Sequence, residues 1–491
     1  MKHQIFLAMD FGASSGRGML GRFDGARLEL EELHRFSNYY VDTGGTYYWD
    51  VFRLFHELLT ATEKAGRAAG PGGLTSLGLD TWGTDFGLLD ANGQLLGSCR
   101  CMRNADGLGV RLAHERMSPQ ELFRRTGVQT ISGNTLFQLC ERRYAADVAL
   151  ERAGALLMLP DLLAYFLTGE RWNEYTIATT SMLFDPLRRG WDLRLMAAMG
   201  LPEHLMGDIL YPATARLSVR RELCGPLGLG SLAYIPVATH DTAAAVAAIP
   251  LKEGEVFCSS GTWSLFGVEM DLPLLTEEAR LAGFSNEGTA DGRVRFLKNL
   301  MGLWVLQQCM EEWGRAGQGL SWPELVALAE GEAPFRSLVD LERLEFYNAG
   351  NMAFKLQRHC ADTGQPVPET RGQIARCVYE SIALRYRVTR DQLEKLTGKA
   401  LGCLHIVGGG SQNAMLDQFA ANALGCPVYA GPAEAASAGN LLMQVMARGE
   451  IAGWTQMRQV VEDSFVRQSY EPRDEAYWDE AYQRFLTLIA E

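Results

Sequence analysis

An aspartate in front of a glycine- and serine-rich loop is the first feature of the chain that could do chemistry. Asp10 ends an apolar run and precedes the loop Gly12-Ala13-Ser14-Ser15-Gly16, which Arg17 closes. Backbone N–H groups of such a loop can converge on a phosphate, and an arginine adds a charged donor. The loop also fits an ordinary hairpin turn. A buried, unpaired carboxylate is costly, so Asp10 favours a ligand: a magnesium ion, a water molecule or another cation.

A second aspartate, Asp241, follows a predicted strand from Tyr234 to Ala238 and begins an alanine-rich helix. An aspartate at this place can simply cap the helix. It also stands at the end of a strand, where ligands of α/β proteins usually bind. The pattern leaves both interpretations open, and a base for a sugar hydroxyl fits the second one.

The stretch LHIVGGGSQNAMLDQFAANALG is typical of a strand, a glycine turn and a helix that begins near Ser411 or Asn413. It is not a dinucleotide fingerprint, because the sixth position of GxGxxG counted from Gly408 is Asn413, and no acid ends the next predicted strand. The chain also lacks a P-loop motif. The three glycines offer instead a flat backbone surface for an adenosine.

These residues must be positioned by alternating strands and amphipathic helices, which predict an α/β protein with mixed sheets. One helix is expected from about Gln373 to Arg387, with one face packed on a sheet. The stretch GLDTWGTDFGLLDANGQLL is expected to form consecutive strands of a hairpin or meander, with a turn at Asp90 to Gly93.

The chain repeats one pattern about half its length apart. The strand, Gly/Ser turn and strand around Asp10 to Gly16 are echoed by Phe257 to Thr262 and the strand after it. Such self-similarity predicts two related halves. We place the domains at residues 1–248 and 249–491.

Composition limits the possible partners. The 491 residues are 47% hydrophobic and 21% charged with a net charge of -13, which is typical of a large globular protein and argues against nucleic-acid or anionic-membrane binding. The first apolar run is too short for a signal peptide, and none reaches the roughly 18 residues of a membrane span. A cytoplasmic protein without membrane or nucleic-acid partners is therefore expected.

Cysteine and histidine spacing predicts no structural metal. The ten cysteines contain no CxxC pair, and the eight histidines are scattered. Neither a disulfide framework nor a zinc motif is visible. Free thiols are expected, and only Cys360 and Cys377 are left open as a possible pair.

Taken together and in order, these motifs resemble those of the FGGY carbohydrate kinases of the actin-like ATPase group, over almost the whole chain. The segments that carry the resemblance are DFGASSGR at Asp10, HRFSN at His34, LDTWGTDFGLLD at Leu79, HDTA at His240, SSGTWSL at Ser259, KNLMGLWVLQ at Lys298 and IVGGGSQN at Ile406. HDTA and SSGTW place the chain in the superfamily only, whereas DTWG and NLMGLW point to the branch that acts on deoxyketoses.

The resemblance implies two actin-like ATPase (ribonuclease H-like) domains, with mixed sheets flanked by helices and a cleft between them. The N-terminal domain would bind the sugar and carry the first phosphate loop, and the C-terminal domain would bind the nucleotide. The implied substrates are a small-molecule ketose and MgATP, so ATP and Mg²⁺ are expected, in a monomer or homodimer.

The resemblance also implies roles for single residues. Asp241 matches the catalytic base and Asp10 the acid associated with magnesium. The positions that match sugar contacts are Gly83, His240, Asp241, Thr242 and Asn299. The positions that match nucleotide contacts are Ala13, Ser14, Ser15, Gly16, Arg17, Thr262, Gln307 and Gly409.

One segment departs from the family pattern. Cys101-Met102-Arg103-Asn104 stands where many members have Tyr-Arg-Asp, so an amide replaces an acid and the preferred sugar is left open. Alternatives are a kinase of another ketose, such as L-fuculose or L-xylulose, and a nucleotide-dependent sugar sensor without activity. Retention of Asp241 favours an enzyme, because a sensor has no use for a base.

Overall fold

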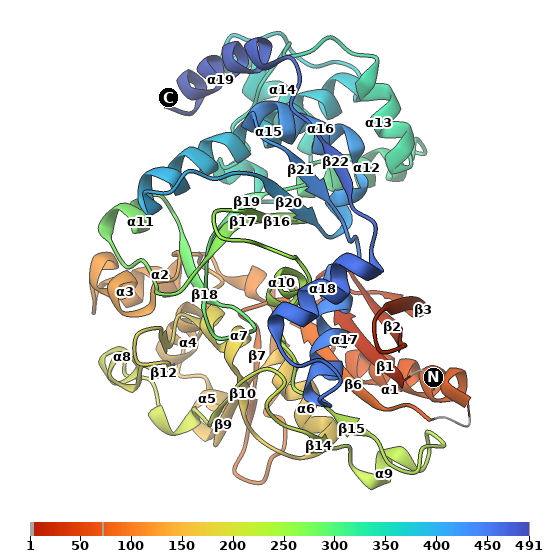
Figure 1. Cartoon of the computed structure of the whole chain (residues 1–491). Coiled ribbons are helices and arrows are strands. Elements are labelled where there is room, and N and C mark those ends of the chain that lie inside the picture. Colours follow the sequence, from red (N-terminus) through yellow and green to blue (C-terminus); the bar gives the residue numbers. More distant parts are fainter. Residues whose placement is uncertain (1–3, 71–72, 491) are drawn as a thin grey trace. The chain divides into compact units, whose positions relative to one another are not determined.

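The computed structural model describes residues 4–70 and 73–490, which form two compact units (Figure 1). Unit 1 runs up to Pro250 and also contains Glu269–Phe296 and Ala435–Ser464. Unit 2 contains Leu251–Val268, Leu297–Glu434 and the segment from Phe465 onward. The chain thus first changes unit at Pro250, but two later segments return to unit 1. The domain boundary at 248/249 stays a prediction.

Unit 1 is built on a six-stranded sheet in which the central strand β1 is antiparallel to β2 and parallel to β6. β1 is buried over nearly its whole length because it is covered on both faces and paired on both edges, which explains its continuous apolar run. The strands, in sheet order, are β14 (Leu217–Ser218), β15 (Ala233–Tyr234), β6 (Ser76–Thr81), β1 (Gln4–Phe11), β2 (Ser15–Phe23) and β3 (Leu28–Ser37).

Two helices from distant parts of the sequence position functional residues beside this sheet. Helix α17 (Ala435–Ala447) packs on β1 and β6 and against the alanine-rich helix α10 (Asp241–Ala247) (Figure 1). A Cβ atom at Gly439 would lie 1.9 Å from the carbonyl oxygen of Ala244, so only glycine permits this approach. The close packing brings the polar residues of α17 next to the ends of β1 and β6.

The expected pairing of consecutive strands fails between β6 and the next strand, β7 (Phe86–Leu89). Both edges of β6 are already hydrogen-bonded, to β1 and β15, so β7 cannot pair with it. β7 pairs instead with β9 (Ala155–Met158). The predicted turn at Asp90 to Gly93 does form, and it closes a bridge between Leu89 and Leu95.

The remaining elements of unit 1 surround these strands. They are β4 (Tyr40–Asp42), β5 (Tyr47–Trp49), α1 (Val51–Ala69), β8 (Cys99–Arg100), η2 (Met102–Asn104), α2 (Leu108–His114), α3 (Pro119–Thr126), α4 (Thr135–Tyr144), α5 (Val148–Arg152), α6 (Leu159–Thr168), β10 (Asn173–Glu174), α7 (Tyr175–Ala178), η3 (Thr179–Ser181), β11 (Phe184–Asp185), β12 (Gly190–Trp191), α8 (Leu193–Met199), η4 (Glu203–Leu205), β13 (Ile209–Leu210), α9 (Arg221–Cys224), α11 (Glu277–Leu281) and α18 (Trp454–Ser464).

The second large sheet repeats the arrangement of the first. Its strand β16 is antiparallel to β17 and parallel to β20, as β1 is to β2 and β6. The predicted repeat is therefore confirmed at the level of strand pairing. The strands, in sheet order, are β18 (Ser285–Gly288), β19 (Val294–Met301), β17 (Trp263–Met270), β16 (Val256–Ser260), β20 (Leu404–Val407), β21 (Val428–Ala430) and β22 (Gln468–Tyr470).

The helix expected from Gln373 to Arg387 is confirmed and is longer. α15 runs over Arg371–Thr397 because a capping box at Thr370 and Gln373 starts it and a left-handed Gly398 ends it. The other helical elements of unit 2 are α12 (Trp304–Arg315), α13 (Trp322–Glu330), η5 (Leu344–Phe346), α14 (Met352–Asp362), η6 (Gly409–Gln412), α16 (Ala414–Leu424) and α19 (Glu475–Ala490).

All ten cysteines are free, as expected, and all of them are buried. Among the helices that the structure describes, none combines the length and the apolar character needed to cross a membrane.

Candidate active site

The first glycine-rich loop is held from one side and open on the other. The Gly12 N–H donates to the carbonyl oxygen of Ser15 (3.0 Å), and Asn38 donates from its backbone to Ser14 (2.9 Å) and from its side chain to Gly12 (2.9 Å). Ala13 and Ser14 are exposed. The HRFSN motif thus braces the loop through Asn38 and leaves the backbone at its tip available to a ligand.

Gly16 and Arg17 follow in β2. A Cβ atom at Gly16 would lie 2.1 Å from the ring of Phe36, so no other residue fits there. Arg17 stands opposite Asp10 in the register, with its Nε 3.4 Å from Asp10 Oδ2. The guanidinium therefore lies at the base of the loop beside a carboxylate.

A third carboxylate, which lies in the DTWG motif but was given no role by the sequence analysis, completes this end of unit 1. Asp80 is the register partner of Asp10 on the parallel strand β6 and is fully buried. Burial raises the pKa of Asp10, against the opposing charge of Arg17. Burial, and then the charges of Asp10 and Asp241, raise the pKa of Asp80 well above its usual value. Ionisation of these carboxyl groups is therefore unfavourable unless a cation in addition to Arg17 joins them.

Helix α17 supplies a polar partner for Asp80. Asn440 Nδ2 donates to Asp80 Oδ2 (2.7 Å), and Gln444 Nε2 donates to Asn440 Oδ1 (2.8 Å). Gln444 in turn accepts from Ser76 Oγ (2.8 Å). Asp80 Oδ1 is buried and has no hydrogen-bond partner among the described residues. The network therefore fixes Asp80 while leaving one carboxylate oxygen without a donor.

Asp241 is the first residue of α10, and the N-cap of that helix is His240. The interpretation of Asp241 as the cap is therefore wrong. Its Oδ1 accepts from the backbone N–H of Thr242 (2.5 Å) and from Thr242 Oγ1 (3.1 Å), and 31% of its side chain is exposed. Burial and the charge of Asp10 raise the pKa of Asp241 to about 7. A carboxylate that titrates near neutral pH is suited to accept a proton and is reachable from solvent.

His240 contacts a buried arginine, Arg295, that the sequence analysis missed. Arg295 is fully buried, with its Nη2 3.0 Å from His240 Nδ1 and 3.2 Å from Glu287 Oε2. Burial, and then the charge of Arg295, lower the pKa of His240 well below its usual value, so the imidazole is neutral. Arg295 Nη1 has no hydrogen-bond partner in the described parts of the chain. The signal available in the sequence was a lone arginine within the apolar strand segment VRFL.

Buried Glu174 holds the segment that leads into His240. It accepts from the backbone and hydroxyl of Thr239 (3.0 and 2.9 Å) and from the N–H of Thr176 (2.8 Å). The His240 N–H donates to Thr176 Oγ1 (3.3 Å). The HDTA motif is thereby fixed in place, and Glu174 is a positioning residue that no motif indicated.

Gly83 lies in the turn after β6, where a Cβ atom would be 3.0 Å from Thr180 Oγ1. The next residue, Thr84, has a positive φ of 71°, which strains a β-branched residue. The turn is stabilised by buried Asp85, which accepts from the indoles of Trp49 (2.6 Å) and Trp82 (2.8 Å). Such strain is often retained at a ligand site.

Asn104, the amide that replaces the family acid, has a structural role. Its Nδ2 donates to the carbonyl oxygens of Tyr47 (2.7 Å) and Cys101 (2.9 Å), and its Oδ1 accepts from the Tyr47 N–H (2.7 Å). All of its hydrogen-bonding groups are engaged with backbone.

Unit 2 brings two of the predicted nucleotide residues together. Thr262 Oγ1 donates to Gln307 Oε1 (3.1 Å). Gly409 begins η6 directly after β20, between glycines that allow this turn to pack on Ser260: a Cβ atom at Gly410 would lie 2.0 Å from Ser260 Oγ. Asn299 lies on β19 and is half-buried.

Residues 5–248 match the N-terminal domain of the FGGY family of carbohydrate kinases, and residues 256–448 match its C-terminal domain. The chain belongs to the FGGY family of carbohydrate kinases. It is accordingly an ATP-dependent sugar kinase, as the motifs implied.

Relatives match this kinase almost from end to end. A rhamnulokinase from Bacteroides thetaiotaomicron is 42% identical over 488 residues, which is 99% of each chain. A rhamnulokinase from Oceanobacillus iheyensis is 37% identical over 470 residues, 95% of this chain and 98% of the relative.

Solved structures are similar in fold at low identity. A gluconate kinase from Lactobacillus acidophilus has a TM-score of 0.81 at 15% identity, covering 99% of this chain and 98% of its own. A xylulose kinase from the same organism has a TM-score of 0.80 at 13% identity, with the same coverage. The expected fold class, two actin-like ATPase domains with mixed sheets flanked by helices, is confirmed.

Proposed function

We propose that this kinase transfers the γ-phosphoryl group of MgATP to the C1 hydroxyl of L-rhamnulose, giving L-rhamnulose 1-phosphate and ADP in L-rhamnose catabolism. The sugar assignment is supported by relatives named rhamnulokinase that align over nearly their whole length, at up to 42% identity. The observation that carries the chemistry is Asp241, whose pKa is raised to about 7 at the start of α10.

Asp241 accepts the proton of the C1 hydroxyl as that oxygen attacks the γ-phosphorus. Phosphoryl transfer needs little covalent work from a protein, so the rate depends on alignment of the reactants and stabilisation of charge. Thr242 fixes the carboxylate through two hydrogen bonds to one oxygen, which leaves the other oxygen to face the sugar. Gly83, His240, Thr242 and Asn299 contact the sugar in this proposal.

His240 contributes as a neutral group. Burial, and then the charge of Arg295, lower the pKa of its imidazole and keep it uncharged, so it can hydrogen-bond a sugar hydroxyl without pairing with Asp241 as an ion. An imidazolium there would hold the base in an ion pair and weaken it.

The carboxylates of β1 and β6 fit a magnesium ion. Asp10 and Asp80 are adjacent in the register, and Asp80 Oδ1 is buried without a donor. Carboxylate oxygens are the ligands that Mg²⁺ prefers. Asp10, with Asp80 behind it, would hold the ion, which supplies charge neutralisation on the nucleotide phosphates. Arg17 and the backbone of Ala13 to Gly16 bind phosphate oxygens.

In unit 2, Thr262 binds phosphate through its hydroxyl, with Gln307 orienting that hydroxyl. Gly409 offers backbone to the nucleoside. These assignments take the two Gly/Ser turns of the repeat as the two phosphate loops.

The test is a panel of ketoses, including L-rhamnulose, L-fuculose and L-xylulose, in a coupled ADP-release assay, with the phosphorylated position read by NMR. We expect the highest kcat/KM for L-rhamnulose and phosphate on O1. A higher kcat/KM for another ketose would overturn the sugar assignment, and sugar-independent ADP release would overturn the kinase mechanism.

We further infer a cytoplasmic monomer or homodimer, without nucleic-acid or membrane partners. Light scattering coupled to gel filtration measures the oligomeric state directly.

A further inference from the structure

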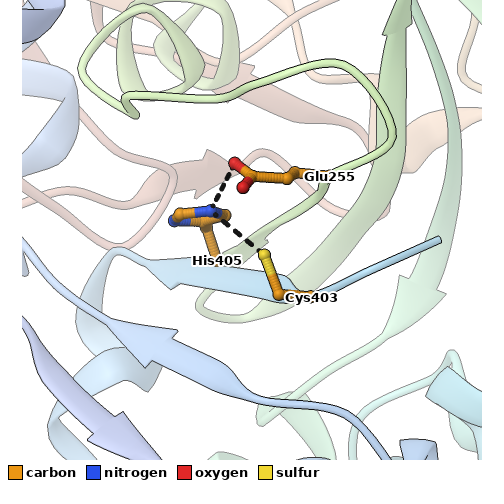
Figure 2. Close-up of side chains that lie close together, drawn as sticks. All are labelled: Glu255, Cys403 and His405. Atoms are coloured by element: carbon orange, nitrogen blue, oxygen red, sulfur yellow. Dashed lines mark hydrogen bonds and ion pairs between the residues drawn. The ribbon is translucent and has the colours of Figure 1, made fainter.

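A second group of side chains of metal-binding types lies in unit 2. Cys403 directly precedes β20 and His405 lies within it, so side chains two residues apart point to one face. Glu255 directly precedes β16, and its neighbour Val256 is the register partner of Leu404. Figure 2 shows the carboxylate, the imidazole and the thiol turned toward one another.

The distances between these donor atoms suit a single ion. His405 Nε2 lies 3.0 Å from Glu255 Oε2 and 3.6 Å from Cys403 Sγ, and all three ligand atoms lie within 4.8 Å of one another (Figure 2). A tetrahedral Zn²⁺ with ordinary bond lengths separates its nitrogen, oxygen and sulfur ligands by about 3.3 to 3.6 Å. The side chains therefore need to move only slightly to bind zinc.

The ligand set also matches zinc in chemical type. Thiolate and imidazole together favour Zn²⁺ over Mg²⁺ or Ca²⁺, which prefer oxygen. One thiolate and one carboxylate balance the charge of the ion, which matters because Cys403 and His405 are buried.

Hydrogen bonds hold the carboxylate of Glu255 in place. Its Oε2 accepts from the Lys252 N–H (2.9 Å) and lies 3.0 Å from His405 Nε2. The thiol of Cys403 must lose a proton when a metal binds, because the thiolate is the metal ligand.

Arg467 is the feature that opposes binding. Its Nη1 lies 3.5 Å from His405 Nδ1, at the limit of a hydrogen bond. When Nε2 binds a metal, Nδ1 carries the proton and no longer accepts from Arg467. The Tyr429 ring, whose centroid lies 5.7 Å from Cζ of Arg467, remains a partner for the guanidinium.

We propose that Glu255, Cys403 and His405 bind one Zn²⁺ ion, with a water molecule as the fourth ligand. The ion would cross-link the N-terminal ends of β16 and β20. The predicted nucleotide residues Thr262 and Gly409 follow the C-terminal ends of these strands. The site therefore stabilises the sheet of unit 2 and takes no part in phosphoryl transfer.

The experiment uses the full chain, freed of metal by dialysis against a chelator and kept in excess Mg²⁺, which occupies oxygen-rich sites. Zn²⁺ is titrated against a competing chromophoric chelator, and Co²⁺ is used separately because a Co²⁺–thiolate bond gives a charge-transfer absorption band. We expect one Zn²⁺ per chain, a cobalt–thiolate band, release of one proton on binding, and a higher Tm with Zn²⁺.

Cys403→Ser should abolish the cobalt–thiolate band and weaken Zn²⁺ binding at least about tenfold, or 1.4 kcal/mol. Cys224→Ser, which removes a buried thiol from unit 1, is the matched control and should retain both. Should Cys403→Ser fail to fold by circular dichroism, the partly exposed Glu255→Gln provides the second test, with weaker Zn²⁺ binding and a retained band expected. The proposal is overturned if the unmodified chain binds no Zn²⁺, if Cys403→Ser keeps the band, or if Glu255→Gln binds Zn²⁺ as the unmodified chain does.

Discussion

The two strand–loop–strand motifs of this kinase share one topology and differ in chemistry. In unit 1, β1 lies between antiparallel β2 and parallel β6, and the register pairs Asp10 with Asp80. In unit 2, β16 lies between antiparallel β17 and parallel β20, and the register pairs Ser259 with Val407. The same backbone therefore supports a pair of acids in one unit and a neutral pair in the other.

This difference shows that the topology provides the strand–loop–strand motif and that the pair of acids is found in the motif of unit 1 only. Buried like charges raise each other's pKa and destabilise the metal-free state, which unit 1 tolerates and unit 2 avoids. We infer that unit 1 retains them because base and cation chemistry need them.

Among substitutions of the acids of unit 1, Asp241→Asn should have the largest effect. The amide keeps the size of the side chain but cannot accept a proton, so we expect kcat to fall by roughly 100-fold or more with little change in ATP binding. The measurements are steady-state kinetics and nucleotide titration. Asp90→Asn, in an exposed turn where asparagine serves equally well, is the control and should keep normal kcat. Near-normal turnover of Asp241→Asn would remove the base from this residue.

The pH profile provides the next test. Because the base must be ionised and its pKa is raised to about 7, kcat/KM should be level above that pH and fall below it, by about tenfold per pH unit. The charge of Asp10 contributes to this shift, so Asp10→Asn should move the acid limb to lower pH. A profile with no acid limb near neutral pH would contradict the role of Asp241.

Asp80→Asn separates the effect of the Asp10–Asp80 pair on stability from its effect on Mg²⁺ binding. A raised pKa in the folded state means that ionised Asp80 opposes folding at neutral pH, so the amide should raise the Tm of the magnesium-free protein. The same change should raise the Mg²⁺ concentration needed for half-maximal activity by about tenfold, because one carboxylate is lost at the cation.

Asp85→Asn is the matched control for that substitution. Asp85 is as buried as Asp80 but hydrogen-bonds two indoles, so its amide variant should leave the Mg²⁺ dependence unchanged. Equal Mg²⁺ dependence in Asp80→Asn and Asp85→Asn would show that Asp80 plays no part at the cation.

The smallest effect on kinetics is expected for a substitution in the strand–loop–strand motif of unit 2. Thr262→Val removes a hydroxyl and leaves Gln307 without its donor, so KM for ATP should rise by about 2- to 10-fold, with KM for the sugar unchanged. Thr262→Ser keeps the hydroxyl and should behave normally. A change confined to the sugar KM would contradict the assignment of Thr262 to the phosphates.

Local sequence was sufficient to predict features that are formed by one continuous segment of the chain. It predicted the strand–loop–strand motifs around Asp10 and Ser259, the start of a helix at Asp241 and the long helix α15. It failed for β6 and β7, because a turn between two strand-like runs does not reveal that both edges of the first strand are already paired. SLGLD ends in an acid as IFLAMD does, so the sequence carried a signal for Asp80 that was not used.

The sequence by itself determined the family, the two Gly/Ser turns and the candidate base, because these depend on short segments whose residue types and order are sufficient. Only the tertiary structure decided that Asp80 lies beside Asp10, that Asn440 donates to Asp80, that Arg295 contacts His240, and that Glu255 contacts His405. Parallel strand pairing and helix packing bring together residues tens to hundreds of positions apart. The spacing of residues within a short segment does not predict which distant segments will pair or pack.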